Sequence, residues 1–168
     1  MEQMETLGRF LTMVFNGKSL VLFGAALAVV LPGIGSARGV STVAKATAGL
    51  ISEDPNKYGK SMLLQALPMT QGIYGMVTAF LIMIFSNVTD PVLSAELTIE
   101  NGAYFFFAAL PIAFGGLYSA IKQGEVAAAG ISVLAKRPDA VGKAVISASF
   151  VELYAILALL ISLLLILL

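Results

Sequence analysis

A single glutamate within a long apolar run is the feature that most constrains this chain. Residues 144–168 read AVISASFVELYAILALLISLLLILL, and Glu152 is the only acidic or basic residue among them. A helix of this length spans the roughly 30 Å hydrocarbon core of a bilayer. At about 1.5 Å per residue, Glu152 lies roughly 14 Å beyond Lys143, close to the membrane midplane. A carboxylate at that depth is costly unless it is protonated, paired or bound to an ion, so we expect Glu152 to be functional. The alternative is a neutral glutamic acid that hydrogen-bonds a neighbouring helix.

The composition supports a membrane protein and excludes several classes of chemistry. Hydrophobic residues make up 58% of the chain, charged residues only 12%, and the mean hydropathy is +0.92. Cysteine and histidine are absent, which removes disulfides, thiol nucleophiles and histidine-based sites. Ten basic and ten acidic residues cancel, so no nucleic-acid partner is indicated. The sequence contains no phosphate-binding G-x-x-x-x-G-K-[ST] loop, and we expect no enzyme activity in the chain by itself.

Three other apolar stretches are long enough to span a membrane, at about residues 19–47, 61–88 and 103–134. The first contains the G-x-x-x-G pair Gly35 and Gly39. Small residues recur every fourth position in the third stretch, at Gly116, Ala120, Gly124 and Ala128. Such residues let helix backbones approach closely in lipid. The sequence therefore predicts an all-α membrane protein with four transmembrane helices.

An internal repeat divides these four helices into two hairpins. Residues 55–60 and 138–143 both read P-x-x-x-G-K, each between a span rich in small residues and a span with a polar site. We expect an N-terminal lead-in at 1–17, interfacial or flexible and without the features of a secretory signal. A first transmembrane hairpin follows at 18–89, then an external loop at 90–102, and a second hairpin at 103–168 that carries Glu152.

Polar side chains also occur inside two of the other predicted spans. Thr70, Gln71 and Tyr74 follow Pro68, which removes a backbone N–H and distorts the adjacent turn. These residues either form a polar site or mark a kink with helix–helix hydrogen bonds. Gln123 reaches the membrane level of Glu152 if the third span projects beyond the bilayer. Otherwise Gln123 is a solvated side chain on the projecting part.

Charge placement predicts the orientation in the membrane. The two hairpin turns, residues 52–60 and 136–143, carry five basic side chains, whereas the loop 90–102 carries acids only. By the positive-inside rule both turns face the cytoplasm, and both termini are external. We therefore expect a multi-pass protein of the cell membrane.

Four segments of the sequence resemble a known family. They are GIGSARGV (33–40), LLQALPMTQGIYG (63–75), LPIAFGGLYSAIKQGEVAAAGI (110–131) and ASFVELYAIL around Glu152. The chain resembles the K subunit of bacterial V-type sodium-transporting ATPases, the fused-hairpin form of the membrane rotor proteolipid called the c subunit. The resemblance spans roughly residues 20–168. It implies a homo-oligomeric ring that rotates against a stator, with one ion carried by each copy.

The same resemblance implies a ligand set for Na⁺. The ligands would be the Glu152 carboxylate, the Thr70 hydroxyl, the Gln71 and Gln123 side-chain oxygens and the Leu67 backbone carbonyl. Tyr74 would hydrogen-bond the carboxylate. The implied partners are a stator membrane subunit with an arginine facing Glu152, a central-stalk subunit at the cytoplasmic turns, and the lipid bilayer.

Physical chemistry leaves three functions open. Oxygen ligands suit a hard cation, and one carboxylate neutralises one Na⁺, so a loaded site can face lipid. A rotor that carries H⁺ would need only Glu152, and the Thr and Gln residues would then merely pack. A small four-helix secondary transporter is the third possibility, although one small polar site disfavours a substrate-sized cavity. Three oxygen-bearing side chains at matched depth favour the sodium rotor.

Overall fold

The computed structural model describes residues 2–168, and within that range it contains helices and no strand. Six α-helices occur in this part of the chain: α1 (Glu2–Val14), α2 (Gly17–Glu53), α3 (Tyr58–Ala66), α4 (Thr70–Phe85), α5 (Ile99–Lys136) and α6 (Val141–Leu167). Four helical stretches are long and apolar enough to cross a membrane, namely Gly17–Glu53, Pro55–Phe85, Ile99–Lys136 and Pro138–Leu167. The predicted all-α architecture with four apolar spans is confirmed.

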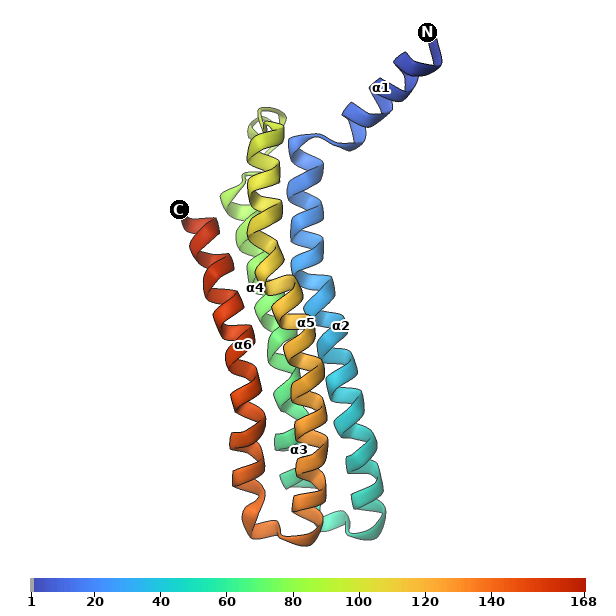
Figure 1. Ribbon diagram of the computed structural model, residues 1–168, viewed down its shortest axis with the longest axis vertical. Helices are drawn as coiled ribbons and strands as arrows, with labels where there is room; N and C mark the ends of the chain where they lie inside the picture. The colour runs from blue at the N-terminus through green and yellow to red at the C-terminus, as the bar shows by residue number, and fades with distance from the viewer. Residues whose placement is uncertain (1) are drawn as a thin grey trace.

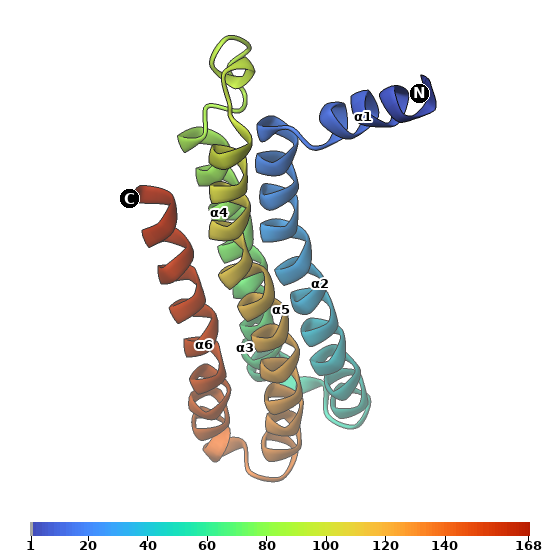
Figure 2. The same ribbon diagram turned by 45° about the horizontal axis from the view of Figure 1, so that its top comes forward.

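The four spans form an elongated bundle of two hairpins. Figures 1 and 2 show α2 and α5 side by side, with α6 on the far side of α5 from α2. The turns that follow α2 and α5 lie at one end of the bundle. The α4–α5 connection, α1 and the C-terminus lie at the other end (Figure 1). The two basic turns therefore share one end.

Glycines bring the two central helices into contact. A Cβ added to Gly124 of α5 would meet the backbone of Gly39 in α2, and one added to Gly35 would lie 2.5 Å from the Leu117 carbonyl oxygen. Ala120 is fully buried at the same interface. Only residues without a larger side chain permit this approach. The close-packing role predicted for these positions is confirmed.

The second span is a composite of several helical segments. A 3₁₀ turn at Pro55–Lys57 leads into α3, and a second 3₁₀ turn at Leu67–Met69 separates α3 from α4. The second turn contains the buried Pro68, whose ring cannot donate the hydrogen bond that an α-helix requires at that position. The predicted distortion at Pro68 is confirmed, and it occurs directly before Thr70 and Gln71.

Lysines of the first turn tie the two hairpins together at the basic end. Lys57 Nζ donates a 3.0 Å hydrogen bond to the carbonyl oxygen of Ala135, near the C-terminus of α5. Lys60 Nζ lies 3.4 Å from the carbonyl oxygen of Pro138 in the second turn. A cation is favoured at a helix C-terminus, where carbonyl groups lack helical partners.

The N-terminal lead-in is helical, which fits the interfacial alternative of the expectation and not the flexible one. Figures 1 and 2 show α1 pointing away from the bundle. Its apolar side chains Leu7, Phe10 and Leu11 are exposed, and Glu5 and Arg9 form an ion pair one turn apart. An apolar stripe beside a charged one is typical of a helix that lies in a membrane interface.

Candidate ion-binding site

The Glu152 carboxylate lies at the meeting point of α4, α5 and α6. Tyr74 of α4 donates a 2.6 Å hydrogen bond from its hydroxyl to Oε1 of Glu152. Gln123 of α5 donates from Nε2 to Oε2 of Glu152 at 3.3 Å. The two carboxylate oxygens thus accept from two different helices.

Two buried glutamines connect α4 to α5 beside that carboxylate. Gln71 and Gln123 are both 0% exposed, and Nε2 of Gln71 donates to Oε1 of Gln123 at 2.6 Å. Gln123 also donates to the carbonyl oxygen of Ala148 in α6, at 3.3 Å. Gln123 is therefore part of the site, and the alternative of a solvated glutamine on a projecting helix end is wrong.

Thr70 and Leu67 lie at the break between α3 and α4. The Thr70 hydroxyl donates to the Leu67 carbonyl oxygen at 3.1 Å and lies 3.4 Å from Oε1 of Gln71. The 3₁₀ turn, a consequence of Pro68, aligns the Leu67 carbonyl with Thr70. The structure therefore links Thr70, Gln71, Gln123 and Glu152 in one hydrogen-bonded chain. The six residues singled out from the sequence gather in this one region.

Sequence reasoning missed Ser119, which the structure adds to this cluster. Ser119 Oγ lies 3.4 Å from Nε2 of Gln71 and donates to the carbonyl oxygen of Val151 at 2.9 Å. Ser119 precedes Gln123 by four residues, so both side chains share one face of α5. That spacing was the available signal. Ser119 lies one helical turn further from Pro138 along α5 than Gln123 does, and it contacts Gln71 from that side.

Within the described residues, no basic side chain pairs with Glu152. Four ion pairs occur among the side chains that the structure describes, and Glu152 takes part in none of them. The nearest charged residues along α5, Lys122 and Glu125, pair with each other at 2.9 Å. An ionised Glu152 in the membrane interior therefore needs a cation from outside its own chain.

The arrangement suits a small hard cation. A carboxylate, a hydroxyl, two amide side chains and a backbone carbonyl at a helix break are all oxygen donors. Their hydrogen bonds to one another hold the side chains together, and rotation of the amide groups would direct their oxygens toward an ion. The single negative charge balances a single positive one.

Comparison with known proteins gives one family and two relatives. The family model that describes the C subunit of ATP synthase matches the chain twice, over residues 23–82 and 106–165. The V-type sodium ATPase subunit K of Enterococcus hirae is 47% identical over 152 residues, which is 90% of this chain and 93% of that protein. The A-type ATP synthase subunit K of Methanocaldococcus jannaschii is 39% identical over 142 residues, 84% of this chain and 59% of that protein.

Proposed function

Because the chain belongs to the family of the ATP synthase C subunit, we propose that it is the ion-carrying subunit of the rotor ring of a V-type ATPase. As a member of this family it is a non-catalytic membrane subunit, and ATP chemistry belongs to partner subunits. Each copy binds one Na⁺ at Glu152 and carries it through the membrane as the ring rotates. The E. hirae relative is named a sodium ATPase subunit, which supports this choice of ion.

The convergence of Thr70, Gln71 and Gln123 on Glu152 is the observation that carries the proposal. The Na⁺ ligands are the Glu152 carboxylate, the Thr70 hydroxyl, the side-chain oxygens of Gln71 and Gln123, and the Leu67 carbonyl oxygen. Tyr74 holds the carboxylate from outside this ligand set, through its 2.6 Å hydrogen bond. A proton alone would need only the carboxylate and one hydrogen-bond partner. Several further neutral oxygen donors favour a metal cation over a proton.

The charge of the site explains how rotation couples to transport. A loaded site is neutral and can face lipid at low cost, whereas an empty site is a bare carboxylate. Within the described residues, no ion pair reaches Glu152. The family resemblance assigns the compensating cation for the empty site to an arginine of a stator subunit. Unloading and reloading occur only at that contact.

The proposed orientation places the two basic turns in the cytoplasm and both termini outside. The positions of the turns, at one end of the bundle in Figure 1, are compatible with this topology. The central-stalk subunit then binds the turns, residues 52–60 and 136–143. In this assignment the first hairpin is 18–89, the external loop 90–102 and the second hairpin 103–168.

Protection from a hydrophobic carbodiimide tests the ion. The reagent modifies Glu152 in its protonated form, and bound Na⁺ displaces that proton. We expect millimolar Na⁺ to slow modification of the purified ring, and K⁺ at the same concentration to have much less effect. The Glu152→Gln variant reports background reaction at other carboxyls. Equal protection by K⁺ and Na⁺, or protection by neither, would establish the proton rotor in place of the sodium rotor.

A further inference from the structure

Two serines at equivalent positions of the repeat contact the start of α4 from two different helices. The segments matched by the family model begin at residues 23 and 106, so equivalent positions lie 83 residues apart, and Ser36 of α2 corresponds to Ser119 of α5. Both side chains are almost fully buried, at 8% and 5% exposed. Ser36 contacts Gly72, and Ser119 contacts Gln71. The two serines thus reach consecutive residues of α4, one of which is a proposed Na⁺ ligand.

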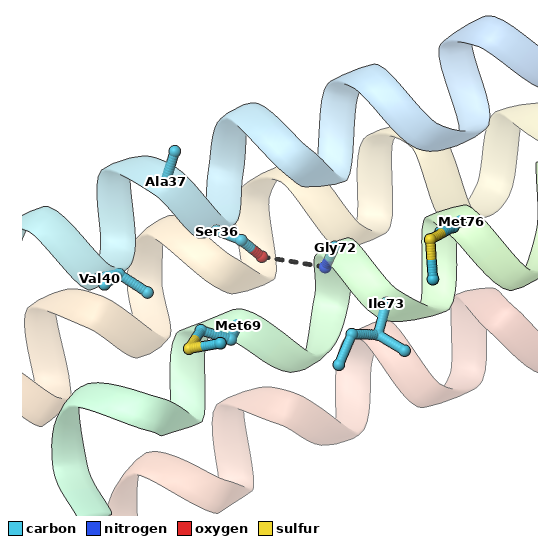
Figure 3. A pocket seen from close by; sticks show the side chains of 7 residues that line it. All are labelled: Ser36, Ala37, Val40, Met69, Gly72, Ile73 and Met76. Atoms are coloured by element: carbon cyan, nitrogen blue, oxygen red, sulfur yellow. Dashed lines mark hydrogen bonds between the residues drawn. The ribbon is translucent and has the colours of Figure 1, made fainter. Parts of the chain in front are cut away.

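Ser36 holds the backbone at the first turn of α4. Its Oγ accepts a 2.9 Å hydrogen bond from the N–H of Gly72, which Figure 3 draws as a dashed line between α2 and α4. The first N–H groups of a helix have no partner within that helix, and α4 begins two residues earlier, at Thr70. A Cβ added at Gly72 would lie 3.2 Å from Ser36 Oγ, so this close approach depends on a glycine. Ser36 therefore fixes the start of α4 relative to α2.

Ser119 holds one end of the Gln71 amide. The NH₂ group of an amide has two hydrogens to donate. Nε2 of Gln71 directs one at Oε1 of Gln123, at 2.6 Å, and the other at Ser119 Oγ, at 3.4 Å. The hydroxyl hydrogen of Ser119 is donated to the carbonyl oxygen of Val151, at 2.9 Å, so Ser119 faces Gln71 as an acceptor. Oε1 of Gln71 then lies on the side of the Thr70 hydroxyl, 3.4 Å away.

The orientation of this amide decides whether Gln71 attracts or repels a cation. An amide presents an acceptor oxygen at one end and donor N–H groups at the other. In the observed orientation the oxygen of Gln71 lies beside the Thr70 hydroxyl, a second neutral member of the proposed ligand set. A half-turn of the amide group would exchange the two ends and place N–H groups there instead. Without an acceptor at position 119, Nε2 loses one of the two partners that oppose this rotation.

We propose that Ser36 and Ser119 are positioning residues that set the Na⁺ affinity of the site without contacting the ion. Ser119 acts through the side chain of Gln71. Ser36 acts through the backbone at the start of α4. The proposal rests on the proposed function, because Gln71 is a ligand only if the site holds a metal cation. Within the described part of the chain, the hydrogen bonds of the two serines go to Gly72, Gln71 and Val151 and not to the Glu152 carboxylate.

Protection of Glu152 from a hydrophobic carbodiimide, titrated with Na⁺ in the purified protein, measures the affinity of each variant. Ser119→Ala should raise the Na⁺ concentration for half-protection by roughly three- to tenfold, as expected for the loss of one hydrogen bond. Ser119→Cys keeps the size of the side chain and replaces a strong acceptor by a weak one, so it should show the same increase. Ser149→Ala is the matched control, because Ser149 bonds to the Val145 carbonyl oxygen of its own helix. Without Na⁺, the pH dependence of the modification should be the same in all these variants.

A double-mutant cycle shows whether each serine acts through the side chain of Gln71. Gln71→Ala binds Na⁺ more weakly but measurably, since only one neutral ligand is lost. In that background Ser119→Ala should cause no further loss, because the amide that it orients is gone. Ser36→Ala should still weaken binding there, because it acts on the backbone. Additive losses for Ser119→Ala would overturn its role, and wild-type affinity of Ser36→Ala in the otherwise unsubstituted protein would overturn the role of Ser36.

The outcomes separate this inference from the proposed function. If Na⁺ fails to protect the unsubstituted protein, the proposed Na⁺ site fails and the inference fails with it. If Na⁺ protects the unsubstituted protein and both Ser119 variants equally, the site stands and the positioning role is overturned. Wild-type affinity in Ser119→Cys alone would assign the loss in Ser119→Ala to packing volume. A shifted pH profile without Na⁺ would assign it to a general disruption of the site, and either result overturns the role of Ser119.

Discussion

Each polar side chain around Glu152 has a definite partner, and the direction of each hydrogen bond determines what a substitution removes. Gln123 receives a bond from Gln71 and gives one to Glu152, so it connects the neutral ligands to the charged one. Tyr74 contacts the carboxylate alone, at 2.6 Å. Among the six residues of the candidate site, Glu152 is the one whose side chain can carry a negative charge to balance a cation. These differences rank the contributions of the three residues to ion binding.

The ranking is testable with three substitutions and Na⁺ binding at equilibrium. Glu152→Gln should abolish binding, because Na⁺ would remain uncompensated in a medium of low dielectric constant. Gln123→Ala should weaken binding by about ten- to a hundredfold, since a bond to a charged group contributes ~1.5–3 kcal/mol. Tyr74→Phe should weaken it least at high pH, where protons do not compete. Ser147→Ala, which removes a bond to its own helix only, is the control. Wild-type affinity in Glu152→Gln would exclude the proposed site.

The site depends on how closely α2 approaches its neighbours. A Cβ added at Gly39 would lie 2.5 Å from the carbonyl oxygen of Ala120 in α5 and 2.7 Å from the Cβ of Pro68. Gly39 therefore contacts both α5 and the 3₁₀ turn at Leu67–Met69, which positions Leu67 and Thr70. A displacement of α2 would therefore move α5 and this 3₁₀ turn, which both contribute residues to the site, relative to each other. In the proposed site, the glycines of α2 and α5 would affect ion binding through this packing.

Gly39→Ala tests this dependence, with Gly49→Ala as its match on the same helix. The added methyl group at position 39 collides with backbone, and overpacking typically costs about 1–3 kcal/mol. A Cβ at Gly49 meets nothing within 4 Å, and alanine is the better helix former by up to ~1 kcal/mol. We expect a lower dissociation temperature and weaker Na⁺ binding for Gly39→Ala only. Equal behaviour of the two variants would contradict the packing role.

The molecule as a whole has two distinct ends. One end holds both basic turns, joined by the bonds from Lys57 and Lys60 to the second hairpin. The other end holds the acidic α4–α5 connection, the C-terminus and the projecting α1 (Figure 1). A rotor needs such polarity, because its soluble stalk must bind on one side only. The distribution of basic residues supports the proposal that the stalk binds at the end with the turns.

Single cysteines measure this orientation and the docking surface. Asn56→Cys and Ala140→Cys, one in each turn, should react with a membrane-impermeant maleimide only from the cytoplasm, and should cross-link to the central-stalk subunit. Val92→Cys, exposed in the α4–α5 connection, should react only from outside. Reaction of Asn56→Cys from the external side alone would reverse the topology and remove the docking surface with it.

Local sequence was sufficient for the features that depend on hydropathy and spacing. Four apolar runs of spanning length predicted four helices, the P-x-x-x-G-K repeat predicted two hairpins, and Pro68 predicted the break before Thr70. Glu152 stood out because an acid in lipid is costly in any fold. The ligand set came from the family resemblance, since composition and spacing alone left a kink and a solvated Gln123 open.

Only the tertiary structure decided which polar groups meet. Gln71 and Gln123 are 52 residues apart, and their 2.6 Å contact depends on the rotation and vertical offset of α4 against α5. Those quantities follow from side-chain packing across helices, which no local pattern encodes. Ser119 was missed for this reason, whereas helix α1 does carry a local signal, an apolar stripe beside a charged one.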